Sequence, residues 1–201
     1  MIGIVDYGAG NLRSVRKALQ FLGFEAAVIA GPENLANADR LILPGVGSFG
    51  YAMEQIRARR LFEPLKEWLE SGRPLMGICL GLQLLTEGSQ ESPGAAGFAV
   101  FKGNCRRFLA RRVPQIGWNS LKILRADGLF SGIREGEFFY FANSYYPAPV
   151  DEDVECVLAV SEHGVEFPVS LRKGNVRGVQ FHPEKSGPAG LRLIGNWVER
   201  C

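Results

Sequence analysis

The sequence predicts an α/β fold: an open, mostly parallel sheet flanked by helices, with an antiparallel, strand-rich C-terminal half. From residue 1 to residue 87, short apolar runs alternate with segments of helical apolar spacing, the pattern of parallel strands joined by crossover helices. From residue 104 onward strand patterns dominate, and Gly174-Asn175 between two of them is a hairpin signal. A length of 201 residues fits one domain of this class. We therefore expect a single domain over residues 1–201.

The first half is predicted to hold strands and helices in alternation. The first helix is expected to be capped by Asn11, with Val15, Ala18 and Leu19 at helical spacing, and to end at Gly23. The predicted strands are 2–6, 25–30, 40–43 and 74–78, and the predicted helices are 12–22, 49–58, 62–71 and 80–87. Ligands of such sheets bind beyond the carboxyl ends of the strands. The loops that begin at Tyr7, Pro44 and Cys79 are all expected at that edge.

The second half follows a Gly/Ser/Pro-rich loop over residues 88–97. Alternating or β-branched runs then predict further strands, and the last apolar stripe predicts a closing helix. The predicted strands are 104–109, 113–119, 137–142, 154–160, 165–172 and 176–181, and the predicted helix is 191–200.

Composition excludes several classes of function. The net charge of +2 gives no electrostatic reason to expect a nucleic-acid or membrane partner. The arginines between residues 106 and 112 are interpreted as a solvated loop, with a phosphate-facing or partner-facing role as the alternative. The start of the chain lacks a signal-peptide pattern, and no apolar run could span a membrane. The four cysteines form no C-x-x-C pair, so we expect a reducing cytoplasm, no metal and no cofactor.

Cys79 lies in Gly77-Ile78-Cys79-Leu80-Gly81, between a predicted buried strand and a predicted helix. Glycines on both sides permit a sharp turn that presents the side chain at the strand end, as in a nucleophile elbow. The start of the following helix favours a thiolate. A lone cysteine among apolar residues is more often a core residue, so the elbow alone does not establish a nucleophile.

His182 is the candidate proton-transfer partner. Of the two histidines, His163 lies in a predicted turn and is interpreted as solvated, whereas His182 follows a predicted strand in His182-Pro183-Glu184. Residues two apart in an extended chain point the same way, so Glu184 is expected beside the imidazole. An exposed turn is the alternative for this segment alone. Together with Cys79, the pattern predicts a Cys-His-Glu triad.

Acyl transfer also needs N–H donors for the developing oxyanion. The backbone N–H of Leu80 is the first candidate, and the loop Pro44-Gly45-Val46-Gly47 is the second source. Its glycines permit the dihedral angles that aim an N–H inward, although an ordinary β-to-α turn explains them equally well.

These motifs together resemble the class I glutamine amidotransferases. Gly77-Ile78-Cys79-Leu80-Gly81-Leu82-Gln83 is similar to the nucleophile segment of that family, and His182-Pro183-Glu184 is similar to its C-terminal segment. The resemblance implies a flavodoxin-like core, glutamine hydrolysis by Cys79, His182 and Glu184, and an oxyanion region at Val46, Gly47 and Leu80. It also implies glutamine binding by the residues Gly45, Gln83, Glu91, Ser144 and Tyr145.

Narrower features resemble one group within the family, whose members pass ammonia to a (β/α)8-barrel cyclase subunit in histidine biosynthesis. They are Asp6-Tyr7-Gly8-Ala9-Gly10-Asn11-Leu12 with Ser14, the Pro44–Gly47 loop, and Pro114-Gln115-Ile116-Gly117-Trp118-Asn119. The resemblance implies a heterodimer with such a cyclase and partner contacts at Asn11, Trp118 and Asn119. Core packing is an equal alternative for Trp118. One departure is Asn143, where the family commonly has histidine before Ser-Tyr.

Three alternatives remain at this point. The chain could serve another synthase, such as that for pyridoxal phosphate, anthranilate or GMP. It could be a catalytically silent interaction subunit on the same fold. It could also be a cysteine hydrolase that acts on peptides, although no sequence feature favours that.

Overall fold

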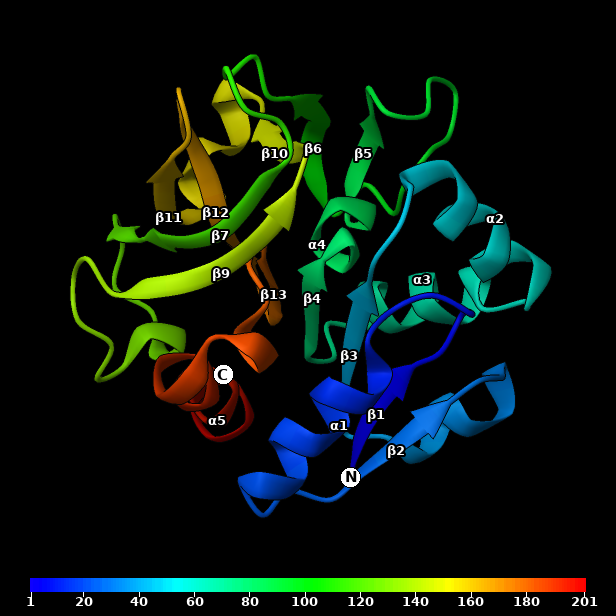
Figure 1. The fold of residues 1–201 in the computed structure, drawn as a ribbon. Helices are drawn as coiled ribbons and strands as arrows, with labels where there is room; N and C mark the ends of the chain where they lie inside the picture. The colour runs from blue at the N-terminus through cyan, green and yellow to red at the C-terminus, as the bar shows by residue number, and fades with distance from the viewer.

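An eight-stranded mixed sheet forms the centre of the computed structural model, which describes residues 1–201 (Figure 1). Its strand order is β2-β1-β3-β4-β13-β12-β11-β8. Strands β2, β1, β3, β4 and β13 run parallel, and β12, β11 and β8 continue the sheet antiparallel. The strands are β1 (Ile2–Val5), β2 (Ala26–Ile29), β3 (Arg40–Gly45), β4 (Leu75–Cys79), β8 (Lys122–Ile123), β11 (Val157–Glu162), β12 (Glu166–Lys173) and β13 (Val176–Val179). The predicted α/β class with an antiparallel second half is confirmed.

Helices cover both faces of this sheet. Helices α1 (Leu12–Phe21) and α5 (Gly187–Arg200) pack on one face, in front of the sheet in Figure 1, and bury Leu19 and Trp197 in one core cluster. Helices α2 (Phe49–Ala58) and α3 (Phe62–Glu70) bury Ile56 and Trp68 in a second cluster on the other face. Each helix presents one apolar stripe to the sheet, as an amphipathic helix in a layered fold must.

Two small sheets and several short helices complete the fold. The three-stranded sheet has the order β10-β6-β5, and the two-stranded β7–β9 ribbon crosses in front of the large sheet (Figure 1). Their strands are β5 (Thr86–Ser89), β6 (Phe101–Arg107), β7 (Gln115–Ser120), β9 (Phe138–Asn143) and β10 (Tyr145–Pro149). The short helices are η1 (Pro32–Asn37), α4 (Leu80–Leu84), η2 (Gly128–Phe130), η3 (Asp151–Cys156) and η4 (Pro183–Lys185).

The predicted helix over residues 80–87 is too long. Helix α4 ends at Leu84, and the chain enters β5 at Thr86, whose buried hydroxyl shares its one hydrogen between the carbonyls of Gln83 and Gly88. A threonine side chain that bonds to nearby backbone favours chain turns over a continued helix.

Other elements also differ from the predictions. The segment before Val157 forms η3 instead of the start of a strand, and its Asp153 accepts a hydrogen bond from the Lys102 N–H of β6. Strand β10 was not predicted, because Pro147 and Pro149 lack the N–H that a ladder needs. As an edge strand, β10 tolerates both prolines.

A buried ion pair lies at the opposite end of the sheet from the strands' carboxyl ends. Asp127 Oδ1 and Oδ2 accept from Arg177 Nε and Nη2 at 3.0 and 3.2 Å, and Arg172 Nη1 donates to Oδ2 at 2.9 Å. Burial raises the pKa of Asp127, but the hydrogen bonds from Arg177 and the Leu129 N–H and the nearby positive charges outweigh it, so this pKa lies below its ordinary value.

We expect Asp127→Asn to destabilise the fold by about 3–5 kcal/mol, because it leaves the buried Arg177 without a counter-charge. Urea unfolding measures this loss. Since the pKa of Asp127 is lower in the folded state, its contribution is present above its unfolded pKa and disappears as pH falls through the folded value. The difference in stability between wild type and variant should therefore shrink in acid; a constant difference would contradict the assignment.

Candidate active site

Three adjacent strands bring the candidate residues together. Ile78 of β4 is the register partner of Pro44 on β3 and of Val179 on β13. Since all three strands run parallel, their carboxyl ends meet at one edge of the sheet. The segments that follow, with Cys79, the Val46 loop and His182, therefore leave the sheet side by side.

Cys79 has a backbone conformation that side chains rarely adopt. Its φ of 55° and ψ of −110° join β4 directly to α4, and the residue is only 6% exposed. Such strain persists where the surrounding structure enforces it. Gly81 permits the turn, since a Cβ there would lie 1.7 Å from the Leu43 carbonyl oxygen. The geometry is that of a nucleophile elbow.

His182 and Glu184 form a buried pair beside this elbow. His182 Nδ1 lies 2.9 Å from Glu184 Oε1, and the two side chains are 4% and 1% exposed. The predicted route to this contact is right only in part: His182 is extended, as expected before Pro183, but β13 ends at Val179 and Pro183–Lys185 forms η4. Ser186 stabilises the turn instead, because its hydroxyl donates to the His182 carbonyl at 2.6 Å and accepts from the Tyr140 N–H.

The environment of His182 favours its charged form. Burial lowers the pKa of His182, but the hydrogen bonds to Cys79 and Glu184 and the charges of both groups outweigh this effect and raise the pKa to about 10. A carboxylate at Nδ1 orients the ring and leaves Nε2 available for a second partner.

Cys79 and His182 line one cavity of about 280 Å3. That volume is at the small end for ligand pockets and suits a metabolite of amino-acid size. Nine of the residues singled out in the sequence line it: Val46, Gly47, Cys79, Leu80, Gln83, Glu91, Ser144, Tyr145 and His182. Glu184 lies behind His182, outside the lining.

Gly45 is the one predicted substrate residue that does not line the cavity. It is opposite Cys79 in the register, and a Cβ on it would lie 2.4 Å from the Tyr7 hydroxyl and 2.8 Å from Leu80 Cβ. Its role in the described structure is close packing of β3 against the elbow. The Tyr7 hydroxyl donates to the Pro44 carbonyl at 2.9 Å and so supports the start of the Val46 loop. The sequence alone indicates no role for Tyr7.

Glu91 and the backbone near Ser144 are held by specific contacts. Glu91 Oε2 accepts from the Phe49 N–H at 2.7 Å, which fixes the carboxylate at the start of α2. The Ser144 carbonyl accepts from the Phe108 N–H, and the Tyr145 carbonyl accepts from Gln83 Nε2 and Asn143 Nδ2 at 2.9 and 3.0 Å. These contacts hold the backbone at Ser144 and Tyr145 in place beside the cavity.

The cavity has further lining residues that the sequence does not predict as site residues: Pro114, Ala142, Asn143 and Lys185. Asn143 is the residue that departs from the family pattern. Its Oδ1 is buried and accepts no hydrogen bond within the chain. Lys185 directly follows Glu184, and that proximity was the only signal that could have found it.

The predicted partner contacts have different surroundings. Trp118 is 57% exposed on the β7–β9 ribbon, which rules out core packing, the alternative role considered for it. Asn119 is engaged inside the chain, because its Nδ2 donates to the Glu162 carbonyl and its Oδ1 accepts from the Ser120 N–H. Asn11 is half-buried and caps α1 through Ser14, as predicted.

His163 was predicted to be solvated, but the structure shows it half-buried in its turn. Its Nε2 lies 2.7 Å from the Arg112 carbonyl oxygen, and its ring packs edge-on against Phe108. It lies outside the cavity that Cys79 lines.

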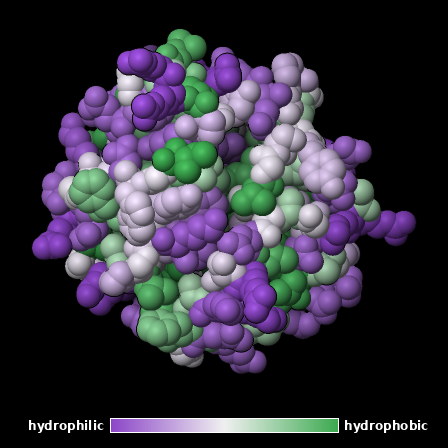
Figure 2. Space-filling model, viewed as in Figure 1, coloured by the Kyte–Doolittle hydropathy of each residue, from purple (hydrophilic) through white to green (hydrophobic).

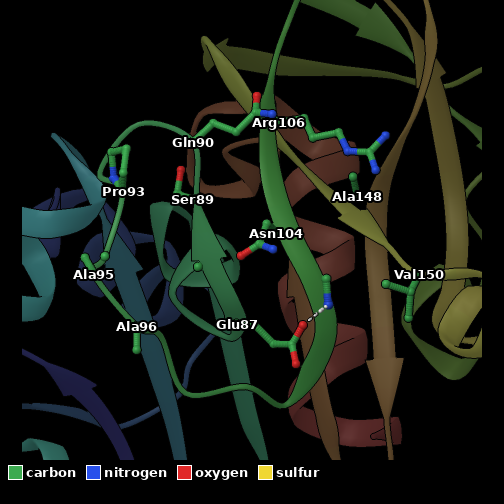
Figure 3. A pocket seen from close by; sticks show the side chains of 13 residues that line it. Glu87, Ser89, Gln90, Pro93, Ala95, Ala96, Asn104, Arg106, Ala148 and Val150 are labelled. Carbon is green, nitrogen blue, oxygen red and sulfur yellow. Dashed lines mark hydrogen bonds between the residues drawn. The ribbon is translucent and has the colours of Figure 1, made fainter.

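A larger cavity of about 640 Å3 lies elsewhere, between the loop around Pro93 and strand β6 (Figure 3). Glu87 on its wall accepts a hydrogen bond from the Gly103 N–H at 2.7 Å. None of the predicted site residues line this cavity, so its size does not make it the active-site candidate.

Comparison with known proteins decides the family. The family model described as "Glutamine amidotransferase class-I" matches residues 3–201. The chain belongs to the class I glutamine amidotransferases. It is thus a glutamine-hydrolysing enzyme, as the motifs around Cys79 and His182 predicted.

Curated relatives within this amidotransferase family confirm the narrower resemblance. The chain is 44% identical to "Imidazole glycerol phosphate synthase subunit HisH" of Caldanaerobacter subterraneus subsp. tengcongensis over 99% of this chain and 98% of the relative. It is 44% identical to the protein of the same name from Methanocaldococcus jannaschii, with 99% of both chains covered. For the one from Moorella thermoacetica, identity is 46%, over 98% of this chain and 94% of the relative.

Solved structures support the fold of an amidotransferase. A structure titled "Crystal structure of glutamine amidotransferase" has a TM-score of 0.77 at 24% identity, with 98% of this chain and 97% of that chain covered. PurLQS from Thermotoga maritima also gives 0.77, at 21% identity and 98% and 96% coverage. No helix of the chain is long and apolar enough to cross a membrane.

Proposed function

We propose that the chain is the glutaminase subunit of imidazole glycerol phosphate synthase, and that it hydrolyses L-glutamine to glutamate and ammonia with a Cys79-His182-Glu184 triad. The observation that carries the proposal is the shared cavity of Cys79 and His182, with Glu184 2.9 Å behind the imidazole. The full-length similarity to subunits of that synthase indicates the use of the ammonia.

The reaction proceeds by acyl transfer to sulfur. The Cys79 thiolate attacks the side-chain carbonyl carbon of glutamine, forming a C–S bond. His182, protonated and oriented by Glu184, gives its proton to the departing nitrogen as the C–N bond breaks, so ammonia leaves. Water, activated by the now neutral His182, then adds to the glutamyl thioester, and glutamate is released as the C–S bond breaks. No metal or cofactor is needed for these steps.

The developing oxyanion needs two N–H donors. The Leu80 N–H at the start of α4 is one, and the loop with Val46 and Gly47 supplies the other. Gly47 has a φ of +102° and Val46 is 42% exposed, so the loop can change its peptide orientation at little steric cost. We propose that this loop adopts its active form when the partner is bound, which prevents waste of glutamine.

The substrate is held by the polar lining of the cavity. We propose that Gln83 and the free oxygen of Glu91 accept hydrogen bonds from the α-ammonium group of glutamine. N–H groups at Ser144 and Tyr145 would contact its carboxylate. Gly45 contributes to substrate binding only indirectly, because its lack of a side chain lets β3 pack closely on the elbow.

The ribbon β7–β9 is the proposed docking surface for a (β/α)8-barrel cyclase subunit. Ile116 and Phe138 are 68% and 54% exposed, and Trp118 pairs with Tyr140 on the same face. Figure 2 shows hydrophobic side chains in small groups among hydrophilic ones on the side of the molecule that carries this ribbon. Ala142, on the same ribbon, lines the cavity, so a protein bound here would lie beside the exit for ammonia.

Within this interface, Trp118 and Asn11 are proposed to contact the partner, whereas Asn119 holds the ribbon to the Glu162 turn. No nucleic acid or membrane takes part, and we expect the heterodimer to work in a reducing cytoplasm.

We expect Trp118→Ala to weaken binding of the cyclase subunit about 10-fold or more, since exposed tryptophans that become buried are frequent binding hot spots. Isothermal titration measures the affinity. Phe21→Ala is the matched control, because Phe21 is 77% exposed on α1 and lies outside the proposed surface. Equal affinities for both variants would contradict the assignment of the ribbon.

The partner assignment is tested by mixing the purified chain with candidate synthase subunits. We expect co-purification with the barrel cyclase, stimulated glutaminase activity and glutamine-dependent formation of imidazole glycerol phosphate and the aminoimidazole carboxamide ribonucleotide. Stimulation only by a synthase for pyridoxal phosphate, anthranilate or GMP would replace the proposed partner. Absence of glutaminase activity with every partner would favour a silent interaction subunit.

A further inference from the structure

A chain of amide hydrogen bonds runs from the wall of the cavity to the nucleophile. The Tyr145 carbonyl accepts from Gln83 Nε2 at 2.9 Å, Gln83 Nε2 donates to Gln180 Oε1 at 3.0 Å, and Gln180 Nε2 donates to Cys79 Sγ at 3.7 Å. Gln83 and Gln180 are 5% and 0% exposed. The bond between Gln83 and Gln180, in the middle of this chain, is therefore buried.

The direction of every bond is fixed by its first acceptor. A backbone carbonyl can only accept, so Gln83 must turn its NH2 group toward Tyr145. That NH2 then has its second hydrogen for Gln180, which must present its carbonyl oxygen in return. The Gln180 NH2 consequently faces the sulfur. A flipped Gln180 amide would place two donors against each other.

We propose that Gln180 is a positioning residue that acts on both sides of this glutaminase site: it donates to the Cys79 sulfur and it holds Gln83 as a pure acceptor. This inference rests on the proposed function. A hydrogen bond to a charged group is stronger than one to its neutral form, so the donor stabilises the thiolate that attacks. Gln83 has no hydrogen left to donate, and its free Oε1 can bind only a donor such as the α-ammonium of glutamine.

The strand register explains why Gln180 is at this place. Val179 is the partner of Ile78, so the next residues, Gln180 and Cys79, lie beside each other at the strand ends. Nothing in the local sequence distinguishes this glutamine from a core residue. Its role appears only when β4 and β13 are adjacent.

Two substitutions separate the two actions. Gln180→Glu retains an acceptor for Gln83 but turns an oxygen toward the sulfur, so we expect kcat for glutamine hydrolysis to fall about 10-fold or more, with KM near the wild-type value. Gln180→Met removes both groups, and we expect a similar fall in kcat together with a KM raised several-fold. The rate of Cys79 alkylation by iodoacetamide at neutral pH should fall in both variants.

Asn196→Leu is the matched control, because Asn196 is a buried amide on α5 that donates to the Leu129 and Ser131 carbonyls and does not line the cavity. The Asn196→Leu variant should be less stable than the wild type, whereas its kcat, its KM and its rate of Cys79 alkylation should equal the wild-type values. All assays use the complex with the cyclase subunit, and synthesis from added ammonium salt reports that each complex is intact.

Unchanged kcat and alkylation rate in both Gln180 variants would overturn the inference and leave the proposed function standing. Loss of ammonium-dependent synthesis by Gln180→Met, with Gln180→Glu fully active, would reduce Gln180 to a structural role and also overturn it. Failure of the proposed function is distinguishable, since it would show as retained glutamine-dependent synthesis when Cys79 itself is replaced.

Discussion

Replacing Cys79 with alanine is expected to abolish glutamine-dependent synthesis by the complex, with a loss on the order of 10⁴-fold or more in kcat, while synthesis from ammonium salt persists. The size follows from removal of the only atom that can form the thioester, a change that in other nucleophilic enzymes leaves just the binding and oxyanion contributions. Alanine keeps the Cβ and therefore the same backbone strain at the elbow, so the variant should fold like the wild type.

The measurement compares glutamine-dependent with ammonium-dependent product formation at equal complex concentration. Cys156→Ala is the control, because Cys156 is a buried thiol outside the cavity. Glutamine-dependent turnover by Cys79→Ala above the background of the buffer would show that another group is the nucleophile.

Replacing Glu184 with glutamine is expected to lower kcat by about 10²–10⁴-fold, since the amide no longer enforces the ring orientation and protonation that the carboxylate does. It also removes one of the causes that raise the pKa of His182 to about 10 from its ordinary 6.5. The titration midpoint of His182 should therefore fall. NMR of the ring protons measures it directly, because the chain has only two histidines and His163→Gln assigns the second signal.

The raised pKa of His182 also makes the stability of the fold depend on pH. A histidine whose pKa is higher in the folded state contributes stability that is fully present below its unfolded pKa and is lost as pH rises through the folded value. For His182 this window extends from 6.5 to about 10. In Glu184→Gln the loss should be smaller and should be complete at lower pH, whereas the exposed Glu199→Gln should leave it unchanged. Identical alkaline unfolding of both variants would contradict the role of Glu184.

The sequence predicted the elements that end at the site because their signals are local. Glycines around Cys79 mark the elbow, and apolar runs mark the buried strands that lead to it. The adjacency of β4 and β13 is not local, since the two strands are distant in the chain, and it was implied only by the resemblance to the family. Sheet order is decided by tertiary packing, which leaves little trace in any one segment.

The site residues that the sequence does not reveal are also those whose contacts depend on which strands are adjacent in the sheet. Gln180 reads as one more buried strand residue, and its contact with Cys79 depends on the register of β13 against β4. Tyr7 supports the Pro44 carbonyl from β1, again across strands. The pairing of Glu184 with His182 was predicted correctly but for a reason that holds only in part, because His182 is extended whereas Glu184 lies in a short helical turn.

The central claim is that one thiol, activated by one imidazole, forms the glutamyl adduct. Labelling with a glutamine-like chloroketone or dihydroisoxazole followed by mass spectrometry tests it most directly. We expect a single label on Cys79, protection by L-glutamine, and a strongly slowed reaction in His182→Ala, with the other three cysteines unmodified. A label on any other cysteine, or labelling of Cys79 that neither glutamine nor loss of the imidazole affects, would contradict the account.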